Sequence, residues 1–238
     1  MPVTAVGFDF LGTLVDAKAD VNECISSMCS HLHSCGFGFN DNDFLESYRA
    51  TVRKYRTKRN EDLREVNNHI WLHDTLKKMG FDVKATDHVL FSTVEIYFSM
   101  WQLSVFPDVY KALETISQGY RIGLVSNFTD SGFLQSSLRK FGIDDYLETI
   151  VVSDTIGWRK PHPKIFQSFL DSMNVEAKDA VYVGDNPEAD IKGAQNAGIT
   201  AVLISRQGGE GRKPRDIIPD YTINSLMELE ELLSTLIN

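Results

Sequence analysis

Polar side chains that could do chemistry follow the apolar segments of this chain, at the point where each segment ends. In chain order they are Asp9, the pair Ser126 and Asn127, Lys160, Asp185 and, five residues later, Asp190. The set contains a candidate nucleophile, a hydroxyl group, a cation and two further acids. Carboxylates are ligands for a hard divalent cation, and ammonium and hydroxyl groups bind anions, so this set can hold a metal and an anion together.

The elements that must position these side chains are five short apolar runs that predict strands. Each run is too continuous for a half-exposed strand, as expected of a parallel sheet covered on both faces. The runs are Val3–Phe8, Arg121–Val125, Thr149–Val152, Ala180–Val183 and Thr200–Ile204. Helical segments separate the later runs, which predicts a doubly wound parallel α/β sheet. Ligands of such sheets bind at the carboxyl ends of the strands, where the polar residues lie.

Five helices are predicted in this part of the chain, one before the second strand and four after it. Several have Pro at the start or Gly just past the end. They cover Pro107–Gln118, Ser131–Phe141, Pro163–Met173, Ala189–Ala197 and Ser225–Ile237. The loop Gln207–Pro214 is predicted to be flexible. We expect the first strand to lie between the second and the fourth, which brings Asp9 beside Asp185.

The long segment between the first two predicted strands, residues 15–104, has no convincing strand and predicts four helices. The first carries an apolar stripe that ends at Gly36, and the second ends near Arg59. The third runs to Gly80, and Thr86 is a plausible N-cap of the fourth. We expect a helical cap domain inserted into a core made of residues 1–14 and 105–238.

Composition narrows the class of partner. The formal net charge of −9 argues against nucleic acid or an anionic membrane surface as the main partner. No apolar run approaches the roughly 18 residues of a membrane span, and no signal peptide is recognisable. The three cysteines are odd in number and clustered, which does not suggest a disulfide framework. A cytoplasmic setting is expected, and no motif predicts an oligomeric state.

The cysteine- and histidine-rich segment CSHLHSC, residues 29–35, raises the question of a zinc site. On a helix, residues two apart point to different sides, so the four side chains cannot converge on one ion. Two pairs on separate faces are predicted instead.

Taken together, four motifs resemble those of the haloacid dehalogenase superfamily, most of whose members are phosphatases. The motifs are Asp9-Phe-Leu-Gly-Thr13, Leu124-Val-Ser126-Asn, Gly157-Trp-Arg-Lys160-Pro-His-Pro and Gly184-Asp185-Asn-Pro-Glu-Ala-Asp190. Each motif alone is weak, but four in order, each at a strand end, are specific. The helical insert resembles the C1 cap of that family.

The resemblance implies roles for these residues. Asp9 would attack phosphorus and form an aspartyl-phosphate intermediate. Lys160 would neutralise the charge that shifts in the transition state, and Ser126 would bind a phosphoryl oxygen. Mg²⁺ would be held by Asp9, by Asp185 as the preferred direct ligand, and by Asp190 directly or through water.

The remaining members of the expected site lie close to these motifs. Thr13 belongs to the first motif and is included in the catalytic set. The substrate is expected near Asn127, Gly12 and Phe10. Gly12 either lets the backbone approach the substrate or only permits a tight turn. Phe10 either shapes the pocket or fills the core.

Repulsion between acids supports a metal independently of the resemblance. Asp9, Asp185 and Asp190 brought together without a cation would raise one another's pKa values. Lys160 alone can offset only part of their charge.

One position departs from the pattern of the phosphatases. There, the residue two after the nucleophile offers its backbone carbonyl to the metal, and its carboxylate protonates the leaving group and then activates water. Leu11 stands at this position and retains the carbonyl as a metal ligand, but it cannot transfer a proton. General acid–base catalysis contributes about 10²–10⁴-fold.

Three interpretations follow. The favoured one is a metal-dependent hydrolase of a small phosphorylated metabolite, which either uses leaving groups that need little protonation or takes an acid from the cap, where the candidates are His31, His33, His69 and His73. The second is a metal-independent 2-haloacid dehalogenase with Asp9 as nucleophile, although those enzymes usually carry Tyr at position 11 and lack an acid at position 185. The third is a catalytically impaired domain that binds a phosphorylated ligand or a protein.

Overall fold

The computed structural model describes residues 3–206 and 216–236, which fold into two compact units. One unit combines the chain up to Asp16 with the chain from Ser104 onward, and the other comprises Ala17–Leu103. The two units are described separately below.

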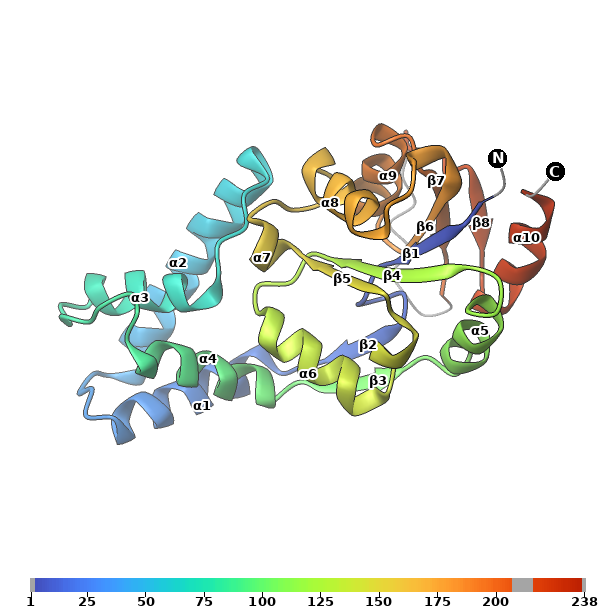
Figure 1. Ribbon diagram of the computed structural model, residues 1–238. Helices are drawn as coiled ribbons and strands as arrows, with labels where there is room; N and C mark the ends of the chain where they lie inside the picture. Colours follow the sequence, from blue (N-terminus) through green and yellow to red (C-terminus); the bar gives the residue numbers. More distant parts are fainter. Residues whose placement is uncertain (1–2, 207–215, 237–238) are drawn as a thin grey trace. The chain divides into compact units, whose positions relative to one another are not determined.

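The first unit is built on a six-stranded sheet in the order β5-β4-β1-β6-β7-β8, with every neighbouring pair parallel. Its strands are β1 (Ala5–Phe8), β4 (Arg121–Ser126), β5 (Thr149–Val152), β6 (Ala180–Gly184), β7 (Thr200–Ile204) and β8 (Tyr221–Ile223). The doubly wound α/β fold and the place of β1 between β4 and β6 are confirmed (Figure 1). Strands β1 and β6 are buried throughout, which accounts for their continuous apolar sequences.

The edge strand β8 was not predicted. It has only three residues, and two of them, Tyr221 and Thr222, are exposed. A strand this short with one buried side chain gives no apolar run, so its sequence carries too little signal.

Helices lie on both faces of this sheet (Figure 1). They are α5 (Val109–Ile116), α6 (Ser131–Phe141), α7 (Ser153–Ile156), α8 (Pro163–Met173), α9 (Lys192–Asn196) and α10 (Leu229–Thr235). Helices α6 and α8 occupy the predicted residues, and the one-turn helix α7 was not predicted. Helix α8 packs on β4 and β5, and its Phe166 and Phe169 belong to a buried cluster with Tyr182 of β6.

Two predicted helices are more irregular than expected. The segment predicted as Ala189–Ala197 begins as a π-helical turn at Pro187–Ile191 and continues as α9. The C-terminal segment begins as a 3₁₀ turn, Leu226–Glu228, before α10. Ser225 and Glu228 form a reciprocal capping box there, which fixes the start of the turn.

The second unit contains four helices, as predicted: α1 (Val21–Ser34), α2 (Asp41–Asp62), α3 (Asn68–Lys78) and α4 (His88–Ser99). Its core is formed by apolar side chains from all four, including Met28, Leu32, Phe44, Leu72, Leu76 and Leu90. The prediction of Thr86 as N-cap of the fourth helix was wrong by one residue. Asp87 is the N-cap, and its carboxylate accepts a hydrogen bond from the backbone N–H of Val89.

The expectation that residues 15–104 contain no strand was wrong at both ends. Strands β2 (Val15–Lys18) and β3 (Gln102–Val105) pair with each other in a two-stranded sheet. Each has four residues and a mixed polar sequence, VDAK and QLSV, which gives no strand signal. No helix among the described residues is long and apolar enough to span a membrane. The predicted flexible loop Gln207–Pro214 lies outside the described residues.

Candidate active site

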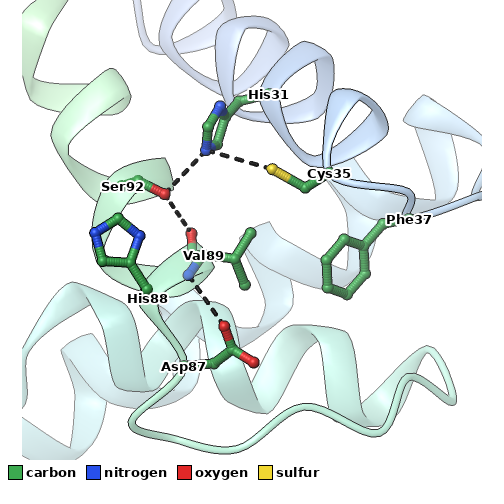
Figure 2. Close-up of a pocket in the computed structure, with 7 residues that line it drawn as sticks. All are labelled: His31, Cys35, Phe37, Asp87, His88, Val89 and Ser92. Carbon is green, nitrogen blue, oxygen red and sulfur yellow. Dashed lines mark hydrogen bonds between the residues drawn. The ribbon is translucent and has the colours of Figure 1, made fainter.

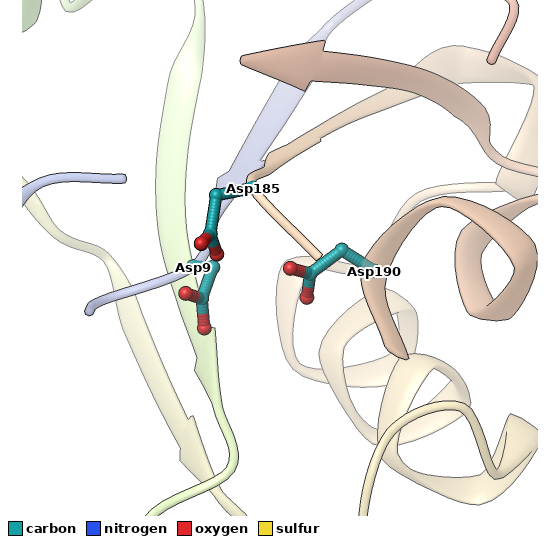
Figure 3. A group of neighbouring side chains, drawn as sticks. All are labelled: Asp9, Asp185 and Asp190. Atoms are coloured by element: carbon teal, nitrogen blue, oxygen red, sulfur yellow. The ribbon is translucent and has the colours of Figure 1, made fainter. Parts of the chain in front are cut away.

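The structure brings three of the predicted acids together at the carboxyl ends of β1 and β6. Asp9 follows β1, Asp185 follows β6, and Asp190 lies in the π-helical turn after it. One carboxylate oxygen from each lies within 4.8 Å of the others. Figure 3 shows the three side chains as neighbours. Among the described residues this is the one group of three or more acidic, histidine or cysteine side chains with metal-binding geometry. All its donors are oxygens, which suits Mg²⁺.

Lys160 places a buried ammonium group between two of these acids. Its Nζ lies 2.6 Å from Oδ1 of Asp9 and 2.6 Å from Oδ1 of Asp190. It also donates hydrogen bonds to the carbonyl of Val125 at 2.8 Å and the hydroxyl of Tyr182 at 2.8 Å. The lysine side chain is only 2% exposed, so its charge is compensated by these protein groups rather than by water.

Sequence reasoning missed Tyr182. Its ring is fully buried in β6, and its hydroxyl donates to the carbonyl of Val125 at 2.8 Å while accepting from Lys160. The available signal was a tyrosine in an otherwise aliphatic buried strand, because a buried tyrosine hydroxyl usually has a polar partner. Here that partner is the expected catalytic lysine.

Asn127 holds the backbone of Lys160 from both sides. Its side-chain amide donates to the carbonyl of Lys160 at 2.9 Å, and its side-chain oxygen accepts from the N–H of Lys160 at 2.7 Å. The side chain expected near the substrate therefore fixes the loop that carries the lysine. Ser126, the last residue of β4, is 2% exposed.

Asp190 and Asp185 differ in how their carboxylates are engaged. Oδ1 of Asp190 contacts Lys160, and its Oδ2 accepts from the backbone N–H of Asn186 at 2.9 Å. Asp190 is also 1% exposed, whereas Asp185 is exposed. Asp185 is therefore better placed to contact a metal directly, and Asp190 to act through Lys160 or a water molecule.

Two glycines make room for these carboxylates. A Cβ atom on Gly12 would lie 2.4 Å from Oδ2 of Asp185, and the φ of +85° at Gly12 also disfavours other residues. A Cβ on Gly184 would lie 2.4 Å from Cγ of Asp190. The structure is therefore compatible with both expectations for Gly12, a tight turn and a close approach of the backbone. The group that the backbone approaches is the carboxylate of Asp185.

The electrostatics of the cluster favour a cation. The pKa of Asp9 is raised to about 7; burial is the largest cause, Lys160 opposes the rise, and Asp190 and Asp185 add to it. Burial alone would lower the pKa of Lys160, but Asp190 and Asp9 outweigh it and the pKa is raised. Lys160 thus contacts two of the three clustered carboxylates, and a divalent cation would relieve the remaining repulsion. The residues present therefore fit Mg²⁺.

The rest of the first motif is largely buried. Phe10 is 0% exposed and meets Phe128 edge to face, with ring centroids 6.3 Å apart, which favours the core-filling interpretation. Thr13 is also fully buried, and its hydroxyl has no hydrogen-bond partner among the described residues. Leu11 is half-buried and forms an isolated bridge with Val15, so position 11 offers no side-chain proton donor to the cluster.

The candidate substitute acids of the helical unit have partners within that unit. His33 contacts Asp41 at 2.7 Å, His73 contacts the carbonyl of Val83 at 3.1 Å, and His69 stacks on Phe91. His31 contacts Ser92 and Cys35, as Figure 2 shows. The use of any of them as a replacement acid stays a prediction.

Comparisons with known proteins give a consistent result. Residues 6–204 match the family model described as haloacid dehalogenase-like hydrolase. A glyceraldehyde 3-phosphate phosphatase from Methanopyrus kandleri is 34% identical over 140 residues, which are 56% of this chain and 58% of the relative. The chain thus spans little more than half the length of that relative. A ribulose-1,5-bisphosphate 5-phosphatase from Halopiger xanaduensis is 26% identical over 240 residues, covering 97% and 99% of the two chains.

Among solved structures, a 2-haloacid dehalogenase from Pseudomonas syringae pv. Tomato DC3000 superposes with a TM-score of 0.71. The match covers 98% of this chain and 99% of the other, at 24% identity. At this identity the likeness concerns the fold alone.

Proposed function

Because the chain belongs to the haloacid dehalogenase-like hydrolase family and is therefore a hydrolase, we propose that it is a Mg²⁺-dependent phosphatase of a small phosphorylated metabolite. The observation that carries the proposal is the buried contact of Lys160 with both Asp9 and Asp190, beside the exposed acid Asp185. The names of the similar phosphatases support a small phosphorylated substrate.

Asp9 is the proposed nucleophile. One of its carboxylate oxygens bonds to phosphorus while the bond from phosphorus to the leaving-group oxygen breaks, and the leaving group departs with that electron pair. Water then attacks the aspartyl phosphate, which releases inorganic phosphate, regenerates the carboxylate and returns a proton to solvent. Splitting one displacement into two lowers each barrier.

Lys160 and the strand-end residues hold the reacting groups. The ammonium group touches Oδ1 of Asp9 and is positioned to offset charge that builds on the phosphoryl oxygens. Ser126 is proposed to donate a hydrogen bond to a phosphoryl oxygen. Bound Mg²⁺ would supply charge neutralisation, held by Asp9, Asp185 and the carbonyl of Leu11, with Asp190 acting through water.

Leu11 sets the leaving groups that this site handles well. Without an acid at position 11, the leaving oxygen departs unprotonated unless another group supplies the proton. Acyl and aryl phosphates tolerate this because their leaving groups are weak bases, whereas sugar alkoxides are strong bases. We therefore expect acyl and aryl phosphates to react faster than alkyl phosphates.

A metal-independent haloacid dehalogenase is the second candidate, and Leu11 is the observation that favours it. A departing halide needs no proton, so an apolar residue at position 11 costs that reaction nothing. The three clustered carboxylates count against it, because a reaction without metal has no use for Asp185 close to the nucleophile.

The test is phosphate release from acetyl phosphate and para-nitrophenyl phosphate, with Mg²⁺ and with a chelator. We expect Mg²⁺-dependent turnover that Asp9→Asn abolishes. The exposed Asp145→Asn is the matched control and should retain turnover. For an alkyl phosphate, Leu11→Asp should raise the rate by up to about 10²–10⁴-fold, the range for a restored general acid.

Each contrary outcome identifies an alternative. Full turnover in Asp9→Asn would refute the covalent mechanism. Halide release from a 2-haloacid in the presence of chelator, without phosphate release, would favour the dehalogenase. Silence in both assays, with phosphate binding retained, would favour a binding domain.

A further inference from the structure

Arg206, which lies just after β7, binds the turn that carries the first motif. Its Nε and Nη2 both donate hydrogen bonds to the carbonyl of Thr13, at 3.1 and 2.5 Å. The two residues are 193 positions apart in the sequence, so the contact depends on the tertiary fold. The Arg206 side chain is only 12% exposed, and these bonds are therefore largely shielded from water.

The contact completes the hydrogen bonding of the turn formed by residues 10–15, which we call the first-motif turn. The carbonyls of Phe10 and Val15 accept hydrogen bonds from backbone N–H groups within the turn itself. The carbonyl of Thr13 accepts from the guanidinium of Arg206 instead. Because a buried carbonyl without a partner is costly, Arg206 fixes the direction of this peptide group.

Arg206 is itself held on two sides. Its Nη1 donates to Oδ1 of Asp108 at 2.8 Å, and its guanidinium lies over the ring of Phe106, with Cζ 3.9 Å from the ring centroid. Oδ2 of Asp108 accepts hydrogen bonds from the hydroxyl of Ser225 at 2.7 Å and from the N–H of Leu226 at 2.8 Å. Both oxygens of this carboxylate are engaged, so the planar guanidinium is oriented with its other edge toward the first-motif turn.

The place of the first-motif turn matters to the acidic cluster. The backbone of Gly12 approaches Asp185 so closely that a Cβ atom there would lie 2.4 Å from Oδ2. The preceding residue, Leu11, offers the backbone carbonyl that is proposed to bind Mg²⁺. A displacement of the turn would therefore change both its fit against Asp185 and the place of this carbonyl.

We propose that Arg206 is a positioning residue of the active site, which holds the first-motif turn where Mg²⁺ binding and turnover require it. It acts through the carbonyl of Thr13, and Asp108 orients it. The expected effect on turnover rests on the proposed phosphatase function, whereas the expected effect on the turn does not.

The geometry requires an arginine at this position. One side chain must bind the carbonyl of Thr13 and the carboxylate of Asp108 at the same time. A guanidinium group presents its N–H donors in a rigid planar fork, whereas the ammonium group of lysine is a compact point charge. Arg206→Lys should therefore keep a cation beside Asp108 but hold the first-motif turn less firmly.

The test compares the full-length wild type with Arg206→Gln, Arg206→Lys and the control Arg121→Gln. Arg121 is matched because it also pairs with a carboxylate, that of Glu148, and donates to a backbone carbonyl, that of Met173. It is the first residue of β4, at the end of the strand away from the site. Deuterium exchange followed by mass spectrometry should show faster exchange of residues 10–15 in both Arg206 variants and not in the control.

Metal binding and kinetics give two further readouts. Calorimetry should show Mg²⁺ binding weakened by about 10–100-fold in Arg206→Gln, the scale for residues that orient metal ligands. With acetyl phosphate at saturating Mg²⁺, kcat should fall by up to about 10²-fold, the scale for an active-site group misplaced by about 1 Å. KM should change little, because Arg206 is not proposed to contact the substrate. A role confined to fold stability would lower the unfolding temperature without separating kcat from KM.

Exchange of residues 10–15 at the wild-type rate in a folded Arg206→Gln variant would overturn the proposal, as would equal losses of Mg²⁺ binding in Arg121→Gln. Circular dichroism would verify folding, and if Arg206→Gln does not fold, Arg206→Lys provides the same comparison. A wild type that releases no phosphate would refute the proposed phosphatase. The exchange measurement would still decide the role of Arg206, because it does not depend on turnover.

Discussion

Replacing Lys160 with methionine would remove the one ammonium group that contacts both Asp9 and Asp190. Methionine has a similar length and an apolar end, so the change removes charge with little loss of volume. It leaves two carboxylates, 11% and 2% exposed, facing each other without compensation.

The size of the effect follows from burial. Removing one partner of a buried ion pair destabilises a protein by about 3–5 kcal/mol, because the remaining charge is left in a poorly solvated site. Tyr182 and the carbonyl of Val125 also lose a hydrogen-bond donor at 2.8 Å each. Since the fold contributes no second cation at hydrogen-bond distance from Asp9 among the described residues, we expect the upper part of that range at alkaline pH.

The loss should grow as pH rises. In the wild type, the pKa of Asp9 is raised from 3.8 to about 7, chiefly by burial, although Lys160 opposes this rise. Without Lys160, the folded variant holds the Asp9 proton to higher pH, whereas the unfolded chain releases it near 3.8. The folded state then binds more protons than the unfolded state above that pH, so stability falls as pH increases.

Urea unfolding at pH 5 and pH 8 in chelator would measure this, with free energies from linear extrapolation. Lys178→Met is the matched control, because that lysine pairs with Glu176 at the surface and its loss should change stability little at either pH. The reasoning is refuted if Lys160→Met costs less than about 1 kcal/mol, the scale of a surface pair, or the same amount at both pH values.

Three further predictions concern the supports of the site and of the core. Tyr182→Phe removes a hydroxyl but leaves Lys160 with three acceptors, so the free energy of unfolding should fall by only about 1–2 kcal/mol. We also expect kcat to fall, whereas KM for the phosphorylated substrate should not change. Gly184→Ala should displace Asp190 and weaken Mg²⁺ binding measured by calorimetry, whereas the exposed Gly119→Ala has space for its methyl group and should not. Burial opposes ionisation of Asp108, but Ser225, Leu226 and Arg206 hold its pKa below 3.8. Asp108→Asn should therefore destabilise the protein at neutral pH, and the difference from wild type, followed by thermal unfolding, should shrink as pH falls through that lowered pKa.

The sheet was predictable because burial on both faces leaves a strong sequence signal. Continuous apolar runs marked β1, β4, β5, β6 and β7, and the rule that ligands meet the carboxyl ends of parallel strands placed Asp9 and Asp185 together. Where burial is partial the signal fades. The edge strand β8 and the pair β2 and β3 were missed for that reason.

The residues of the site were predictable as types but not as partners. Asp9 stood out at a strand end, and Lys160 and Asp190 stood out in the segments that follow later strands. The hydroxyl of Tyr182 and the amide of Asn127 contact Lys160 in ways that depend on the path of the loop that carries it. Asn127 is 33 residues from Lys160 in sequence. The N-cap of a helix, such as Asp87, depends only on the first turn of that helix. The prediction there was wrong by a single position.

The acidic cluster lowers the stability of the fold, and this is relevant to whether the site has lost its activity along with the acid at position 11. A buried ion pair is often no more stable than apolar residues of the same volume, and here one ammonium group contacts two of three clustered carboxylates. The burial that raises the pKa of Asp9 therefore lowers the stability of the fold, and the packing of the core does not require it. Gly12 and Gly184 add to it, because each leaves out a side chain where a carboxylate must fit. A domain without a catalytic or binding role would be more stable without this arrangement. The presence of the cluster beside Leu11 therefore favours an active site adapted to a different leaving group over an inactive one.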